Sequence, residues 1–348
     1  MPIRVLVVDD SILFRTNLQL NLHDGKEIAV VGLAANADDA MRRITELSPD
    51  VVTLDVEMPG VSGIQFLKTL IPKRPIPVVI VSAMSLSALD ALDAGAVEFV
   101  KKPTATAPGG LTAFYDELKS KVKIAANAKV RVPGAALHSL VTRFGTVRGG
   151  ENAVIAIGAS TGGTEAIIEV IKELPVSTPG IVIVQHMPAT FTKLYAQRLN
   201  QICKMSVKEA EDYDRVTTGT VIIAAGEYHM RLKKDQGGYF IRSERGEKVS
   251  GHCPSVDVLF DSVADAAGKH AVGVLLTGMG ADGARGIKKM RDCGCYTIGQ
   301  DKDSCVVYGM PMEAYKIGGI SRQLPLDQIG GELVYYLNRA AKENTSSV

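Results

Sequence analysis

The stretch from Ala156 to Gly163, AIGASTGG, places one serine in a glycine-rich loop between an apolar run and a helical pattern. Such a loop can serve two kinds of chemistry. Spaced glycines let a pyrophosphate approach the first turn of a helix, as in nucleotide-binding loops. The pattern Gly158-x-Ser160-x-Gly162 also has the form of a strand-to-helix turn that presents a serine hydroxyl as a nucleophile. The loop alone leaves both interpretations open.

The next apolar run, GIVIVQH, ends with Gln185 and His186. A dinucleotide site requires an acidic residue at this place, because its carboxylate binds the ribose hydroxyls. A P-loop requires a lysine, which the residues GGTE after the serine do not supply. A histidine beside a serine at one edge of a sheet instead indicates a nucleophile and its general base.

A third residue completes this pattern. The run AVGVLLTG leads into MGADGARG and brings Asp282 to the same edge, where a carboxylate would orient the base. Ser160 would attack an acyl carbon, His186 would accept its proton and pass it to the leaving alcohol, and Asp282 would hold the imidazole. Backbone N–H groups after Ser160 and around Met279 would face the oxyanion. The order Ser, His, Asp differs from that of α/β-hydrolases, so a separate framework is expected.

Each of these residues also has an ordinary structural role. Ser160 and Asp282 are residue types that cap helices, and His186 could bond to backbone at a strand end. Their arrival at equivalent strand ends favours a triad. His229 and His252 are interpreted as surface or turn residues, because no paired ligand spacing supports a metal site or a thiolate site with the neighbouring cysteine.

A second group of polar residues follows strands near the N-terminus. Asp9 and Asp10 end the first apolar run, Asp55 the third and Ser82 the fourth, while Lys102 follows the fifth. Carboxyl ends of parallel strands meet at one edge of a sheet. Converging carboxylates suit Mg²⁺, and a hydroxyl and an ammonium can bind phosphoryl oxygens. This makes Asp55 a candidate acyl-phosphate nucleophile.

The elements that position these residues alternate between strand and helix. Residues 3 to about 125 read as five βα units, which form an open parallel sheet with helices on both faces. Residues 126–150 are rich in Pro, Gly and Arg without periodicity, as in a linker. The second half resumes the alternation, and residues 205–245 resemble hairpin strands inserted beside the main sheet.

Composition excludes several classes of protein. The 39 basic and 38 acidic residues leave a net charge of +1, which gives no general field for nucleic acid or an anionic membrane. Five cysteines without CxxC spacing disfavour a disulfide framework and structural zinc, and indicate a reducing cytoplasm. No apolar run reaches the length of a membrane span, so no membrane insertion is expected.

The N-terminal motifs LVVDDS, DVEMPGVSG, VIVSA and VKKP together resemble a response-regulator receiver domain. The resemblance implies that Asp55 is phosphorylated, that Asp9, Asp10 and Asp55 bind Mg²⁺, and that Ser82 and Lys102 contact the phosphoryl group. Phe99, three residues before Lys102, matches the aromatic switch position of that family.

The motifs IGASTGG, VIVQHMP, GHCPSVDVLF, LLTGMGADGA and SCVVYGMP resemble the catalytic domain of chemotaxis protein-glutamate methylesterases. This resemblance implies hydrolysis of glutamyl γ-methyl esters, and deamidation of glutamines, on methyl-accepting chemoreceptors in the cytoplasm. Ser160, His186 and Asp282 match the triad, and Met279 matches the backbone oxyanion donor. No cofactor is implied for the esterase step. Cys253 departs from the arginine that the family usually has before PSVD.

The complete prediction is two doubly wound α/β domains: a flavodoxin-like receiver (1–125) and a Rossmann-like catalytic domain (151–343) with a β-hairpin insertion, joined by the linker (126–150). A chemotaxis histidine kinase would donate the phosphoryl group, and the unphosphorylated receiver would block the face that bears Ser160. One alternative is a nucleotide-binding or non-catalytic output domain. A DNA-binding output is disfavoured, because the second half lacks a basic stripe.

Overall fold

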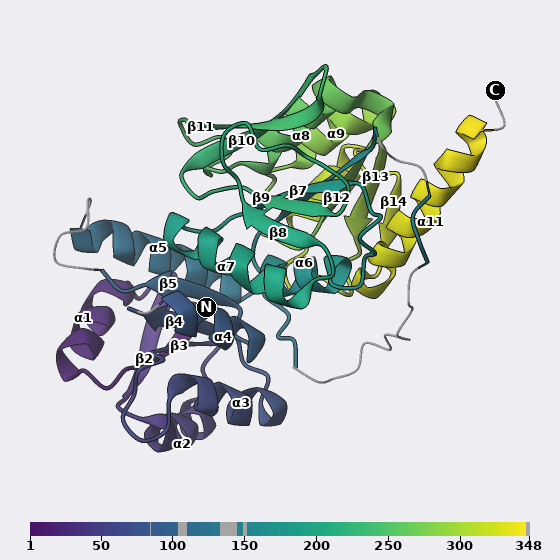
Figure 1. Ribbon diagram of the computed structural model, residues 1–348. Helices are drawn as coiled ribbons and strands as arrows, with labels where there is room; N and C mark the ends of the chain where they lie inside the picture. Colours follow the sequence, from purple (N-terminus) through teal and green to yellow (C-terminus); the bar gives the residue numbers. More distant parts are fainter. Residues whose placement is uncertain (84, 104–109, 133–144, 149–151, 346–348) are drawn as a thin grey trace. The chain divides into compact units, whose positions relative to one another are not determined.

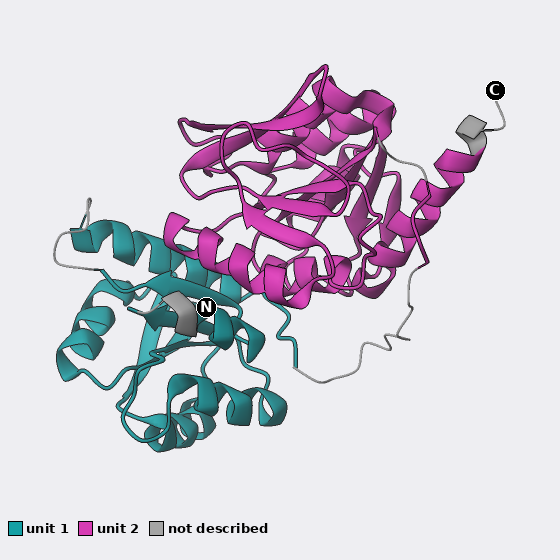
Figure 2. Cartoon of the chain, in the orientation of Figure 1, with its two compact units in different colours: residues 1–135 teal, residues 136–348 magenta. Residues whose placement is uncertain are grey.

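The computed structural model describes residues 1–83, 85–103, 110–132, 145–148 and 152–345. The chain divides into two compact units, Met1–Ala135 and Ala136–Val348 (Figure 2). Much of the predicted linker, residues 133–144 and 149–150, lies outside the described residues. No helix of the described part of the chain is both long and apolar enough to cross a membrane.

Unit 1 is a five-stranded parallel sheet in the order β2-β1-β3-β4-β5 (Figure 1). This is the flavodoxin-like order, so this part of the fold prediction is confirmed. The strands are β1(Ile3–Val8), β2(Ile28–Ala34), β3(Val51–Leu54), β4(Val78–Ser82) and β5(Glu98–Lys101). The helices are α1(Ile12–Leu22), α2(Ala37–Leu47), α3(Gly63–Lys73), α4(Ser85–Asp93) and α5(Gly110–Ala125).

Local sequence explains where these elements begin and end. The central strands are continuous apolar runs, as expected where helices cover both faces of a parallel sheet. Ser11 caps α1 by accepting a hydrogen bond from the N–H of Phe14, and Ser62 forms a capping box with Gln65 at the start of α3. Both caps start a helix soon after a strand, so the polar loops between them lie at one edge of the sheet.

Unit 2 contains a seven-stranded parallel sheet in the order β14-β13-β12-β6-β7-β9-β8. From β9 to β14 this is the Rossmann order, with β8 added at the edge, and the prediction is confirmed. The strands are β6(Val154–Ala159), β7(Gly180–Gln185), β8(Ser206–Glu209), β9(Thr220–Ile223), β12(Ala271–Leu275), β13(Tyr296–Gln300) and β14(Arg322–Leu324). The helices are α6(Gly163–Ile171), α7(Ala189–Ile202), α8(Val256–Ala267), the short 3₁₀ helix η1(Gly268–His270), α9(Ala284–Asp292), α10(Met310–Lys316) and α11(Leu326–Thr345).

The predicted hairpin is present but shorter than expected. Among the described residues, the hairpin consists of the antiparallel strands β10(Tyr228–Asp235) and β11(Gly238–Arg245). The run from Thr220 to Ile223, which was expected in the hairpin, is β9 of the main sheet and pairs in parallel with β7 and β8. The physical reason is burial on both faces: Val221, Ile222 and Ile223 are consecutive and fully buried, as in a central parallel strand.

The two ends of the predicted linker are bonded to, or packed against, the units that they join. In unit 2, the N–H of Val147 donates to Ser177 Oγ at 2.9 Å, and the N–H of Arg148 donates to Asn338 Oδ1 at 2.8 Å. Val147 is buried. In unit 1, the carbonyl of Arg131 lies close to Gly95. The chain is therefore attached to each unit well inside the region predicted as linker.

Candidate active site

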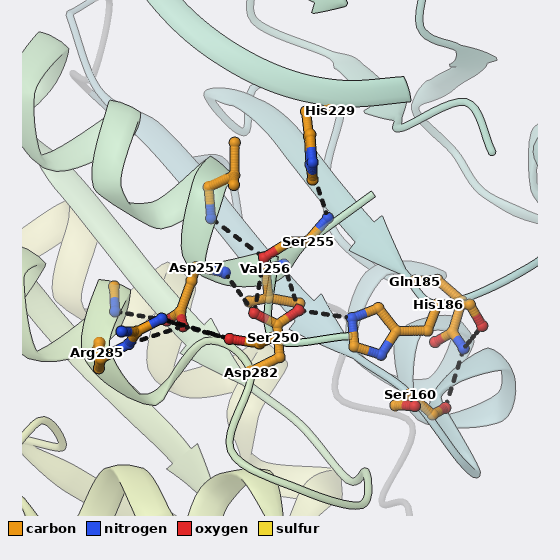
Figure 3. A network of polar contacts seen from close by, with 12 residues as sticks. Ser160, Gln185, His186, His229, Ser250, Ser255, Val256, Asp257, Asp282 and Arg285 are labelled. Atoms are coloured by element: carbon orange, nitrogen blue, oxygen red, sulfur yellow. Dashed lines mark hydrogen bonds and ion pairs between the residues drawn. The ribbon is translucent and has the colours of Figure 1, made fainter. Parts of the chain in front are cut away.

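Three adjacent strands of unit 2 deliver the residues predicted to react. Ser160 follows β6, His186 follows β7, and Asp282 lies in the loop between β12 and α9. Because β6 pairs with both β7 and β12, these loops meet at the switch point of the sheet, where ligands bind in such folds. All three side chains are largely buried. The structure thus brings Ser160, His186 and Asp282 together, as Figure 3 shows.

Asp282 and His186 form the best-defined contact of the site. His186 Nε2 lies 2.8 Å from Asp282 Oδ2. An ionised carboxylate only accepts hydrogen bonds, so Nε2 carries the proton and Nδ1 keeps its lone pair. Nδ1 is buried without a hydrogen-bond partner among the described residues, and in Figure 3 it lies on the side of the ring that faces Ser160. This nitrogen is available to accept a proton.

Asp282 is fixed by donors from the start of α8. Its Oδ1 accepts from Ser255 Oγ at 2.7 Å and from the N–H of Asp257 at 3.0 Å, and its Oδ2 also accepts from the N–H of Val256 at 2.8 Å. Burial alone would raise the pKa of Asp282. The hydrogen bond from His186, the positive charge that this ring carries once it is protonated, and the donors of Asp257 and Ser255 lower that pKa below its ordinary value. Asp282 is therefore held ionised beside the imidazole.

Both the N–H and the carbonyl group of Ser160 form hydrogen bonds. Its N–H donates to the carbonyl of Thr277 at 3.0 Å, and its carbonyl accepts from the N–H of Gly163 at 2.7 Å and from Gln185 Nε2 at 3.0 Å. The N–H groups of Ser160 and Gly163 are thus already used. Within the described residues, the N–H of Met279 donates to no acceptor, which leaves it free for an oxyanion.

The loop that carries Met279 lies directly against Ser160. A Cβ added to Gly278 would be 2.7 Å from Ser160 Cβ and 3.1 Å from its N atom. Only glycine permits this approach, so Gly278 sets the distance between the serine and the next N–H along the chain.

We expect Gly278→Ala to lower kcat about 100-fold, because the added methyl group would lie 2.7 Å from Ser160 Cβ and closer still to Met310 Sδ, so that Met310, Ser160 and the loop must shift against one another. The measurement is the rate of ester hydrolysis at saturating substrate. Gly145→Ala, where an added Cβ has nothing within 4 Å, is the control and should leave kcat unchanged. A Gly278→Ala enzyme of full activity would show that this approach is not needed.

The sequence interpretation is wrong for His229 and incomplete for His252. His252 does lie in a turn, but its ring stacks on that of His186 with centroids 3.6 Å apart and planes 9° apart. His229 was expected at a surface or turn, yet it is buried on β10, where Nδ1 accepts from the N–H of Ser255 at 3.3 Å. A serine before an apolar helical pattern could have identified Ser255 as a helix cap. Nothing in the spacing indicates its bond to Asp282.

The acidic residues of unit 1 also converge. Asp9, Asp10 and Asp55 each offer a carboxylate oxygen, and these oxygens lie within 4.8 Å of one another. Lys102 Nζ lies 2.7 Å from Asp9 Oδ2 and 2.6 Å from Asp55 Oδ2. Burial raises the pKa of Asp9, and the charge of Asp55 adds to this, although the Lys102 ammonium acts in the opposite direction. At Asp9 the effect of burial on the pKa therefore outweighs that of the Lys102 ammonium.

This cluster fits a hard divalent cation. The donors are all carboxylate oxygens, one exposed and two buried, which suits Mg²⁺ with several retained waters. Ser82 ends β4 and is buried, and its carbonyl accepts from the N–H of Lys102 at 2.9 Å. Phe99 is buried on β5. The predicted phosphate contacts therefore lie at the same edge as Asp55.

Comparisons with known proteins find a matching family for each of the two units. The family model described as CheB methylesterase matches residues 155–333, and that of the response regulator receiver domain matches residues 5–108. A curated protein-glutamate methylesterase/protein-glutamine glutaminase 2 of Syntrophomonas wolfei is 52% identical over 97% of this chain and 98% of its own length. A protein-glutamate methylesterase/protein-glutamine glutaminase of Salmonella typhimurium is 44% identical over 95% of this chain and 96% of its own.

A solved structure also resembles unit 2. It is the CheB methylesterase catalytic domain of Thermotoga maritima, with a TM-score of 0.52 and 38% sequence identity. The similarity covers 53% of this chain and 98% of that one.

Proposed function

The chain belongs to the CheB methylesterase family and carries a response-regulator receiver domain before the esterase domain, and on this premise we propose that it hydrolyses glutamyl γ-methyl esters of chemoreceptors. We propose that it also deamidates glutamines of the same receptors. The observation that carries the proposal is the free, buried Nδ1 of His186, which faces Ser160 while Nε2 is bonded to Asp282.

Each side chain then has a role in acyl transfer. Ser160 Oγ attacks the ester carbonyl carbon as its proton passes to His186 Nδ1, and the ionised Asp282 stabilises the imidazolium. The oxyanion accepts a hydrogen bond from the N–H of Met279. When the carbonyl re-forms, the bond to the methanol oxygen breaks and His186 returns the proton to that oxygen. Water then attacks the acyl-serine by the same route and releases the glutamate.

A glutamine substrate follows the same sequence with ammonia as the leaving group. The base, the oxyanion donor and the nucleophile are unchanged, because an amide and an ester both react through a tetrahedral oxyanion, and His186 gives its proton to the departing nitrogen in place of the methanol oxygen. The adaptation of chemoreceptors in the cytoplasm is thus the proposed biological role.

In this proposal, phosphorylation of the receiver domain controls the rate of the esterase. We propose that Asp55 accepts a phosphoryl group from a chemotaxis histidine kinase, with Mg²⁺ held by Asp9, Asp10 and Asp55. The cation would neutralise charge between the carboxylates and the incoming phosphoryl oxygens. Ser82 and Lys102 would then bind the phosphoryl group, Phe99 would follow Ser82, and the restraint of the receiver on the esterase would be released.

Methanol release from methylated chemoreceptor membranes tests both parts. With Mg²⁺ and a small phosphodonor we expect the intact chain to accelerate roughly tenfold, a change within the usual range of allosteric coupling. Asp55→Asn should keep the basal rate and lose the acceleration. Absence of methanol release under every condition would reject the esterase, and acceleration of Asp55→Asn would reject the phosphorylation site. Stabilisation of the chain by NAD or ATP would instead support the nucleotide-binding alternative.

A further inference from the structure

His252 is held over the catalytic site by a short, well-anchored turn. Val249 and His252 exchange two backbone hydrogen bonds of 3.0 Å, and the residues between them, Ser250 and Gly251, have φ of 53° and 85°. Two successive positive φ values define a tight hairpin turn of the I′ kind. The turn thus fixes the backbone that carries the imidazole.

The same helix anchors this turn and the catalytic carboxylate. Ser250 Oγ donates to Asp257 Oδ2 at 3.3 Å, and Arg285 Nη2 lies 3.4 Å from the same oxygen (Figure 3). Asp257 is buried in the first turn of α8, where its own N–H donates to Asp282. The turn of His252 and the carboxylate of Asp282 are therefore both bonded to Asp257, and they contact the face and the Nε2 edge of the His186 ring.

The ring of His186 needs a second constraint. The outer torsion of a histidine side chain is broad, so the hydrogen bond from Nε2 to Asp282 does not by itself prevent rotation of the ring about the Cβ–Cγ bond. Rotation would turn Nδ1 away from Ser160. A flat ring stacked at 3.6 Å, with planes only 9° apart, blocks this rotation.

The stack also favours the reacting state. When His186 takes the proton of Ser160 it becomes a cation against the π face of His252, and a cation is attracted to such a face most strongly where water is excluded. His186 is buried, so this attraction acts at the moment when charge develops.

We propose that His252 is a positioning residue of the esterase: its ring face holds His186 with Nδ1 toward Ser160 and stabilises the protonated imidazole. This role rests on the esterase activity proposed above. It requires an aromatic face and no proton transfer by His252 itself.

Four substitutions at His252 in the full chain distinguish three possible roles of this residue: an aromatic face, apolar packing and hydrogen bonding. His252→Phe keeps a flat π face and should retain kcat within about threefold. His252→Leu keeps apolar volume without a π face, His252→Gln keeps hydrogen-bonding capacity without a ring, and His252→Ala removes all three. These last three should each lower kcat about 10- to 100-fold, as expected when a catalytic base is misaligned, with KM little changed.

The control is His270→Ala, which removes an exposed histidine of η1 and should leave kcat and KM unchanged. Thermal unfolding shows which variants fold, and the comparison of Phe with Leu remains valid if the alanine variant does not. Rescue by Gln but not Phe, a rise in KM at constant kcat, or full activity of the Leu and Ala variants would each overturn the positioning role. Inactivity of the unsubstituted chain would instead count against the esterase itself.

Discussion

Ser160→Ala is expected to lower methanol release by about 10⁴-fold or more, because triads lose nearly all chemical catalysis when the nucleophile is removed. The substitution should leave the fold intact. Within the described residues, the Ser160 contacts are made by its backbone N–H and carbonyl, and Oγ has no hydrogen bond to lose. The cost in the free energy of unfolding should therefore be under about 0.5 kcal/mol.

Three measurements make this prediction decisive: the single-turnover rate, the steady-state rate and the thermal unfolding midpoint. Ser206→Ala, at an exposed position on β8, is the matched control and should resemble the unsubstituted chain. Retention of more than a few per cent of the rate by Ser160→Ala would mean that another group is the nucleophile. A large fall in the midpoint would mean that the hydroxyl is structural.

Asp282→Asn should have the second largest effect, a loss of about 10³- to 10⁴-fold in kcat, as when an asparagine imposes the wrong histidine tautomer in other triads. Both carboxylate oxygens accept hydrogen bonds, Oδ1 from Ser255 and Asp257 and Oδ2 from Val256 and His186. An amide NH₂ at Oδ2 would face the N–H of Val256 and force Nε2 of His186 to become an acceptor. The proton would then sit on Nδ1, where Ser160 needs a base.

The same substitution should destabilise the chain by about 1–3 kcal/mol, since one donor at the start of α8 is left unpaired. The pKa of Asp282 is lowered in the folded chain, so its carboxylate stabilises the fold above the ordinary carboxyl pKa and loses this effect as pH falls through the lowered value. The difference in stability between the two proteins should therefore shrink in acid. Chemical unfolding across this pH range measures it.

Asp257→Asn is a comparison for Asp282→Asn, because Asp257 is also a buried carboxylate at the start of α8 that does not touch His186, although it bonds Ser250 in the turn that carries His252. It should cost stability while leaving kcat within about tenfold. Equal losses of activity in the two variants would indicate that Asp282 acts through the fold of α8 and not through the imidazole.

The sequence predicts which residues meet because strand ends of a parallel sheet converge. That rule alone brings Ser160, His186 and Asp282 to one edge, and it groups Asp55 with the acidic pair after β1. It cannot predict which nitrogen of His186 meets Asp282. The nitrogen that meets Asp282 depends on side-chain torsions and on the conformation of loops, and neither can be predicted from sequence periodicity.

The contacts around the site were therefore the least predictable part. His252 reaches His186 through a turn that follows the β10–β11 hairpin, far from any strand end of the main sheet. The sequence places β9 in the hairpin, because a short apolar run has no periodicity that distinguishes a hairpin strand from a buried strand of a parallel sheet. In both cases tertiary contacts, and not local preference, decide the position.

The attachment of both linker ends to their own units shortens the segment that connects the receiver to the esterase. Val147 and Arg148 are bonded to unit 2 and Arg131 lies against unit 1, so about 15 residues separate the attached ends. A segment of this length spans at most ~55 Å. Short tethers hold their partners at an effective concentration in the millimolar range. Each receiver is thus expected to act on its own esterase, and its control should be independent of how much of the protein a cell contains.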